Sequence, residues 1–169
     1  TIDGGGNGSV VTAIGVGPDT VLDGFTISNG DAVEGGGIGV EGSSLRISNN
    51  LIIGNSAYGG GGIFCGYSGS PTITNNIIED NTADHIGGGI RCYFCSPTIS
   101  LNTIRNNRAE CEGGGGIACN TCSPTITQNT IESNSATADY GQGGGIFFHS
   151  TSQTISQNTI RNNTALTGG

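Results

Sequence analysis

Six cysteines are the residues of this chain whose types and spacing most directly suggest chemistry. Two Cys-x-x-Cys pairs, Cys92 with Cys95 and Cys119 with Cys122, have the spacing of a four-thiolate zinc site. Cys92 and Cys119 also lie 27 residues apart, which is the length of a repeat described below, so the duplicated spacing needs no metal. An even cysteine number in a secreted chain favours disulfides. We therefore expect disulfides, with a pairing that the sequence leaves open, among Cys65, Cys92, Cys95, Cys111, Cys119 and Cys122.

Carboxylates gather in one loop of successive repeats, ahead of each glycine run. Stacked carboxylates repel one another unless a cation lies between them, so a structural Ca²⁺ is one interpretation and a solvated acidic edge is the other. The loop lengthens along the chain, and variable loops on a regular scaffold are where binding usually resides. The candidate calcium ligands are Glu34, Asp84, Glu110, Glu112 and Asp139. We expect no other cofactor.

A second charged group alternates in sign from one repeat to the next. Glu79, Arg105, Glu132 and Arg161 occupy equivalent positions, which predicts ion pairs between repeats. Glycoside hydrolysis needs two carboxylates about 5 to 9.5 Å apart, one of them held protonated. We find no such pair, and we predict that the chain has no catalytic residues. A carbohydrate-active enzyme or a carbohydrate-binding protein is the alternative.

A repeat of 25 to 29 residues must position all of these side chains. It is marked by Gly-Gly-Gly-Ile runs that end at Ile38, Ile63, Ile90, Ile117 and Ile146. Each repeat has three short apolar groups closed by turn residues, which predicts three short strands. With 33% hydrophobic and 5% aromatic residues, the core must be narrow. The pattern predicts a single domain over residues 1–169, an all-β, right-handed parallel β-helix (β-solenoid) of about six rungs.

Asparagines mark two corners of every repeat, five residues apart. Asn tolerates a left-handed backbone, and its amide can bond to its own turn and to the Asn of the next rung. We interpret both columns as structural ladders and not as ligand-binding residues. The first column is Asn50, Asn76, Asn102, Asn129 and Asn158, and the second is Asn55, Asn81, Asn107, Asn134 and Asn163.

Hydroxyl side chains form two further columns around the middle strand of each repeat. These columns are similar to the Thr-x-Thr arrays of β-helical ice-binding proteins, although Arg46 interrupts one of them. Exposed strands and O-linked sugars also explain such columns. The residues are Thr72, Thr98, Thr125 and Thr154, and Thr74, Ser100, Thr127 and Ser156. Asn7, in Asn7-Gly8-Ser9, is a candidate N-glycosylation site.

Three runs carry a family resemblance: Gly87-Gly88-Gly89-Ile90, Ser96-Pro97-Thr98-Ile99 and Ile104-Arg105-Asn106-Asn107. They resemble repeats of right-handed parallel β-helix proteins, the pectate-lyase-like superfamily, and among these the polymorphic outer membrane protein family. That family pairs a Gly-Gly-Ala-Ile-type run with Phe-x-x-Asn, whereas this chain has Gly for the Ala and Ile131 for the Phe. The resemblance covers nearly the whole chain. It implies a secreted or cell-surface passenger, often an adhesin.

Charge and termini complete the expectations. Five Arg, no Lys and a net charge of −8 argue against a nucleic-acid partner, and no stretch reaches the roughly 18 apolar residues of a membrane span. The chain starts at Thr1 and ends in Thr167-Gly168-Gly169, the beginning of another glycine run. From these features we expect a segment of a longer solenoid or a subunit that stacks end to end into a filament. We predict a non-catalytic extracellular structural or adhesive solenoid, whose partners are its own copies, flanking rungs or surface glycans.

Overall fold

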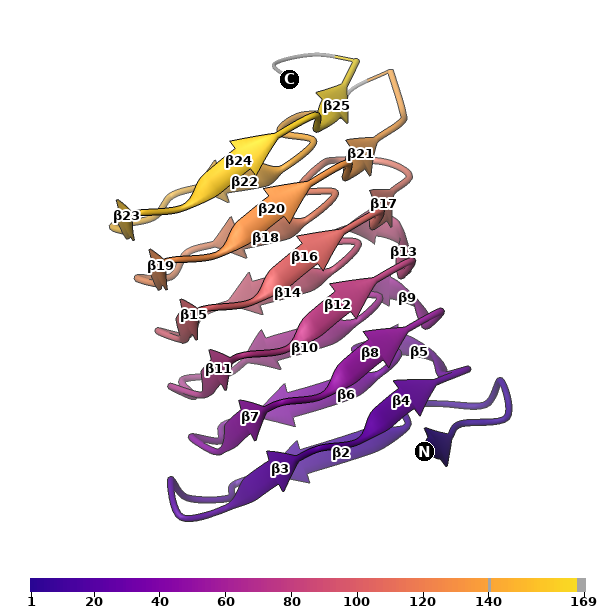
Figure 1. The fold of residues 1–169 in the computed structure, drawn as a ribbon, viewed down its shortest axis with the longest axis vertical. Helices are drawn as coiled ribbons and strands as arrows, with labels where there is room; N and C mark the ends of the chain where they lie inside the picture. Colours follow the sequence, from indigo (N-terminus) through magenta and orange to yellow (C-terminus); the bar gives the residue numbers. More distant parts are fainter. Residues whose placement is uncertain (140, 167–169) are drawn as a thin grey trace.

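The computed structural model describes residues 1–139 and 141–166, and the predicted final glycine run at Thr167-Gly168-Gly169 lies outside them. Strands from successive repeats pair side by side in parallel sheets, so that each repeat forms one rung of a solenoid (Figure 1). Six rungs stack along the long axis, from β2 to β5 at one end to β22 to β25 at the other. The predicted parallel solenoid of about six rungs is confirmed.

The chain passes through four sheets in each rung, numbered here in the order in which the chain meets them. Sheet 1 contains β2 (Val11–Ile14), β6 (Ile38–Glu41), β10 (Ile63–Gly66), β14 (Ile90–Tyr93), β18 (Ile117–Asn120) and β22 (Ile146–His149). Sheet 2 contains β3 (Val21–Asp23), β7 (Arg46–Ser48), β11 (Thr72–Thr74), β15 (Thr98–Ser100), β19 (Thr125–Thr127) and β23 (Thr154–Ser156). Sheet 3 contains β1 (Ile2–Asp3), β4 (Thr26–Ser28), β8 (Leu51–Ile53), β12 (Ile77–Glu79), β16 (Thr103–Arg105), β20 (Thr130–Glu132) and β24 (Thr159–Arg161). Sheet 4 contains β5 (Asp31–Glu34), β9 (Ser56–Gly59), β13 (Thr82–Ile86), β17 (Arg108–Ala109), β21 (Ser135–Ala136) and β25 (Thr164–Ala165).

Sheet 4 is an addition to the three strands per rung that the sequence predicted. Its strands carry a column of alanines, and Ala57 pairs with Ala83 and Ala83 with Ala109. These strands are as short as two residues, too short for an alternating pattern to appear in the sequence. The small side chain lets the backbone turn closely back toward the glycine run of the next rung.

Isoleucines fill the interior as columns that run along the axis. Ile63, Ile90 and Ile117 are register partners in sheet 1, and none of the three is accessible to solvent. Sheets 2 and 3 each add an equivalent column, of which Ile99 and Ile104 are members. Because each rung contributes the same side chain at the same place, the core is narrow and continuous.

Both predicted asparagine ladders are present. The side-chain amide of Asn76 donates to Oδ1 of Asn102 in the next rung and to the carbonyl oxygens of Ile47 and Thr74. The left-handed residue at each corner is, however, the one before the ladder residue, for example Leu101 with φ 58°. Asn is therefore required for its donor and acceptor groups and not for its backbone freedom.

Among the described residues, no helix is long and apolar enough to cross a membrane.

Candidate functional site

The outer surface of sheet 1 carries an ion pair between residues two rungs apart. Ile90 and Cys92 of β14 point into the core, so Arg91 and Tyr93 point outward. Arg91 reaches across β10 to Glu34 at the end of β5, with 2.5 Å between Nη1 and Oε1. The exposed fractions of the two side chains are 15% and 26%, so both charges are largely withdrawn from water. This pair is the centre of what we call the sheet 1 face, formed by Glu34, Phe64, Arg91, Tyr93 and Asn120.

Aromatic rings enclose the guanidinium group. Its carbon lies 5.9 Å from the ring centre of Phe64 and 5.4 Å from that of Tyr93, within cation–π range. Phe64 points outward from β10 but is only 1% exposed. Tyr67 packs edge-on against both Phe64 and Tyr93, at 5.9 and 6.4 Å between ring centres. The face thus combines aromatic side chains with the charged pair of Arg91 and Glu34.

Gly59 makes room for the ion pair. A Cβ atom on this residue would clash with Nη1 of Arg91 and would lie 2.9 Å from Oε2 of Glu34. Burial raises the pKa of Glu34, and the attraction of Arg91 offsets part of that effect. Arg91 thus compensates part, and not all, of the cost of burying the Glu34 carboxylate.

A histidine links the adjacent corner to this face. The His85 ring stacks on Tyr58, with ring centres 4.8 Å apart and planes inclined by 12°, and its Nε2 lies 3.6 Å from Oε1 of Glu112. Glu112 lines a hollow of about 310 Å³ whose other walls are Asn120, Gln142, Phe147 and His149. The hollow thus continues the sheet 1 face toward the last two rungs.

Polar atoms without a partner are concentrated at this site. Among the described residues, four buried side-chain atoms lack a hydrogen-bond partner: Glu34 Oε2, His85 Nδ1, Arg91 Nε and Asn120 Oδ1. Three belong to residues of the sheet 1 face, and the fourth belongs to the histidine beside it. Buried polar groups are normally paired, so the hydrogen bonding of this face and of the neighbouring histidine is incomplete.

The predicted calcium ligands do not converge. Glu34 pairs with Arg91, Glu110 with Arg108 at 3.4 Å and Glu112 with His85, while Asp84 and Asp139 are exposed. Within residues 1–139 and 141–166 no three His, Cys, Asp or Glu side chains are grouped as metal ligands. The variable edge does contribute to the site, through Glu34 and Glu112, but as hydrogen-bonding groups. Calcium at this edge stays a prediction from the sequence.

The alternating column of charges lies on the outer surface of sheet 3, as predicted. Glu79, Arg105, Glu132 and Arg161 are register partners in that order. They form two ion pairs, Arg105 with Glu79 at 2.6 Å and Arg161 with Glu132 at 2.7 Å. Each carboxylate is thereby neutralised by the next rung.

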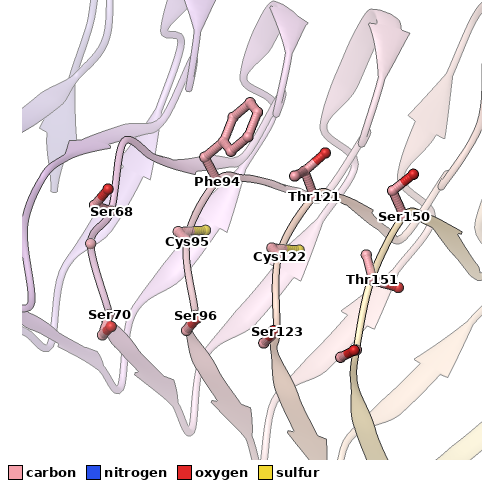
Figure 2. A pocket seen from close by; sticks show the side chains of 12 residues that line it. Ser68, Ser70, Phe94, Cys95, Ser96, Thr121, Cys122, Ser123, Ser150 and Thr151 are labelled. Atoms are coloured by element: carbon pink, nitrogen blue, oxygen red, sulfur yellow. The ribbon is translucent and has the colours of Figure 1, made fainter.

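A second hollow, of about 670 Å³, follows the corner between sheets 1 and 2 (Figure 2). Its rim is a column of hydroxyl groups, Ser70, Ser96, Ser123 and Ser152, one from each rung. Cys95 and Cys122 lie in a neighbouring column, also one per rung (Figure 2). All six cysteines are thiols in the structure, and disulfides stay a prediction.

The two predicted hydroxyl columns lie in register on sheet 2. Thr72, Thr98, Thr125 and Thr154 stack beside Ile73 and its equivalents, and Arg46 continues their column, as predicted. Asn7 is exposed, and its side-chain amide donates to the carbonyl of Gly5 in the same turn. Ice binding and glycosylation at these positions stay predictions.

Residues 2–165 match the family described as the right handed beta helix region. The chain belongs to this family. No curated protein and no solved structure matches the chain. The match establishes a right-handed β-helix, in agreement with the parallel sheets, while the finer resemblance to polymorphic outer membrane passengers stays a prediction.

Sequence reasoning missed most of the sheet 1 face. Arg91, Phe64 and Tyr93 occupy outward positions that differ in residue type from rung to rung, so the repeat gives them no signature. A usable signal was present at Gly39 and Gly66, the register partners of Phe64 and Tyr93, where small residues leave space beside large ones.

Proposed function

We propose that the chain is a non-catalytic extracellular β-solenoid with an adhesive role, and that the sheet 1 face is the surface that contacts its partner. The observation that carries this proposal is the partly exposed Arg91–Glu34 ion pair on an outward sheet surface, surrounded by the rings of Phe64, Tyr67 and Tyr93. Elsewhere in the rungs, the two asparagine ladders pair their amides from rung to rung. The sheet 1 face instead presents charged and aromatic side chains outward, with Tyr67 beside it 54% exposed, where a partner can contact them.

A structural role is supported by the regularity of the scaffold. Four parallel sheets, continuous ladders and cross-rung ion pairs hold every rung to the next. Such a rigid scaffold holds the side chains of a binding surface in fixed positions. The sheets gain one strand for each rung, so flanking chain or a second copy would extend the same ladders, and we include end-to-end stacking in the proposal.

The chemistry of the face favours a glycan as the partner over a protein surface. Sugar rings combine apolar faces with a rim of hydroxyl groups. Tyr93 offers an aromatic surface, and the partly exposed side chains of Arg91 and Asn120 offer hydrogen-bonding groups. Small-molecule and sugar sites generally combine aromatic walls with a few well-placed polar groups.

Binding to an immobilised glycan array and to purified extracellular matrix proteins tests the proposal. We compare the wild-type chain with Tyr93→Ala on the sheet 1 face and with Thr98→Ala on sheet 2. Loss of binding in Tyr93→Ala and its retention in Thr98→Ala would support the assignment, and equal binding by both would move the contact elsewhere. The responding probe distinguishes a glycan partner from a protein partner.

The non-catalytic part has its own test. Incubation with pectin, alginate and chitin is expected to give no new reducing ends and no unsaturated products. Turnover that a single Asp or Glu substitution abolishes would show that the chain is an enzyme.

A further inference from the structure

Five of the six cysteines gather where sheet 1 turns into sheet 2. Cys65, Cys92 and Cys119 are register partners on β10, β14 and β18 and are completely buried. Cys95 and Cys122 follow Cys92 and Cys119 by three residues and belong to the same apolar cluster, with 5% and 6% of their surface exposed. The repeat therefore places thiols from three successive rungs in one region.

Contacts between these thiols form a chain of four. The thiol of Cys92 neighbours that of Cys95 in its own rung and that of Cys119 in the next, and both neighbours affect its pKa. The thiol of Cys119 likewise neighbours that of Cys122. Cys65 has no such partner in its own rung, because Ser68 stands where Cys95 and Cys122 stand in the next two rungs. The Cys95 thiol donates to the Cys65 carbonyl oxygen at 3.2 Å, and the Cys122 thiol donates in the same way to the Cys92 carbonyl oxygen at 4.0 Å.

The thiols follow one another in the order Cys95, Cys92, Cys119, Cys122. Only one set of two disulfides between neighbours uses all four of them. We propose that oxidation closes Cys92 with Cys95 and Cys119 with Cys122, one disulfide in each of two successive corners, and leaves Cys65 and Cys111 as thiols. The competing bond between Cys92 and Cys119 would join two rungs, and it would leave Cys95 and Cys122 without the sulfur neighbour that each contacts in the structure.

The corner hollow provides the route for an oxidant. Cys95 and Cys122 line it (Figure 2). Cys92 and Cys119 do not line it and are completely buried in the core. A small disulfide such as glutathione disulfide can therefore meet Cys95 or Cys122 first. The Cys95 thiolate attacks one sulfur of the reagent and releases one glutathione thiolate, which leaves a mixed disulfide. The Cys92 thiolate then attacks the Cys95 sulfur and releases the second, and the two protons lost by the cysteines go to the two glutathiones.

Oxidation should be slow at neutral pH. Hydrogen bonding to Cys92, followed by burial, raises the pKa of Cys95, and contact with Cys119 raises that of Cys92. The thiolate is the attacking species, so a raised pKa leaves little of it available. The rate is expected to rise with pH across the neutral and mildly alkaline range.

Trypsin separates the two pairings in the native chain. Cleavage after Arg91, Arg105 and Arg108 places Cys92 and Cys95 together in peptide 92–105, and it places Cys111, Cys119 and Cys122 in peptide 109–161. The folded chain is treated with glutathione disulfide and then unfolded without reduction, alkylated and digested. We expect peptide 92–105 to run alone, unalkylated and lighter by two hydrogen atoms. Peptide 109–161 should carry one alkyl group, on Cys111, and peptide 47–91 should carry one on Cys65.

Two results would overturn the proposal. Peptides 92–105 and 109–161 joined by a disulfide would establish the bond between rungs, and six alkylated cysteines would exclude both pairings. As a matched control, Cys65→Ser should still form both corner disulfides. Cys92→Ser should lose the first corner disulfide, retain Cys95 as its mixed disulfide with glutathione and keep the bond between Cys119 and Cys122.

Discussion

Oδ1 of Asn102 accepts two hydrogen bonds from Asn76, one from its backbone N–H at 2.9 Å and one from its side-chain amide at 3.0 Å. The Asn102 amide in turn donates to the Ile73 carbonyl oxygen and to Oδ1 of Asn129, at 2.9 and 3.0 Å. One side chain thus joins three rungs. No other side chain of this size supplies an acceptor and two donors in a fixed plane.

Replacing Asn102 by Asp should therefore destabilise the solenoid strongly. The carboxylate keeps the acceptor for Asn76 but places negative oxygen against the oxygens of Ile73 and Asn129, in a buried site. We expect the free energy of unfolding to fall by about 2 to 5 kcal/mol at neutral pH, measured by denaturant unfolding. Asn106→Asp, the same change at an exposed left-handed position of the same rung, should alter it by less than about 0.5 kcal/mol. Equal losses in the two variants would show that the ladder contributes nothing specific.

Regular spacing explains how much of the fold could be predicted from the sequence. The ladder asparagines, the core isoleucines and the Glu79–Arg105 column recur at one-rung offsets, so alignment of the repeats alone brings them together. Arg91 and Glu34 lie 57 residues apart and two rungs away from each other, because Arg91 reaches past the β10 strand. No alignment of adjacent repeats predicts that contact, and it depends on the space left at Gly59. The candidate site is thus formed by outward-facing residues whose types do not repeat from rung to rung.

Arg91 and Arg105 should differ in their contribution to stability, although each forms one ion pair. The two pairs differ at the arginine: Arg91 is 15% exposed and its Glu34 partner 26%, whereas Arg105 is 44% exposed and its Glu79 partner 13%, so water screens the charge of Arg105 and not that of Arg91. Arg91→Gln leaves the Glu34 carboxylate buried without its counter-charge, and we expect a loss of about 3 kcal/mol in unfolding free energy. Arg105→Gln should cost much less than Arg91→Gln, with a cost that shrinks as salt is added. A larger loss in Arg105→Gln would contradict the burial argument.

Glu34 should make stability depend on pH in the direction opposite to most carboxylates. Its pKa is raised above 4.5 by burial, so the folded chain binds this proton more tightly than the unfolded chain. The stability from Glu34 is fully present below the unfolded pKa and is lost as the pH rises through the folded pKa. The wild-type advantage over Glu34→Gln in unfolding free energy should therefore grow as the pH is lowered from neutral to about 4.

Asp23 provides the control of opposite sign. Hydrogen bonds from Ser48 and then Asn49 lower its pKa below 3.8, so its contribution is present above the unfolded pKa and is lost as the pH falls. The wild-type advantage over Asp23→Asn should shrink on acidification. Parallel pH trends for the Glu34 and Asp23 variants would contradict the assigned causes.

The glycine runs of successive rungs pack so closely that a side chain between them should destabilise the solenoid. Gly89 lies in the run before β14, and a Cβ atom there would stand 2.6 Å from the Gly116 carbonyl oxygen of the next rung and 3.1 Å from the Asn107 amide. Both neighbours belong to hydrogen-bonded ladders, so neither can move without disturbing the adjacent rung. Gly89→Ala should lower the free energy of unfolding by about 3 kcal/mol or more, measured by thermal or denaturant unfolding. A Cβ atom on Gly17 would meet no other atom within 4 Å, and the Gly17 backbone is not left-handed, so Gly17→Ala should be neutral or slightly stabilising through the unfolded state. If both variants retained wild-type stability, the rungs would have to separate more easily at the glycine runs than their hydrogen bonds indicate.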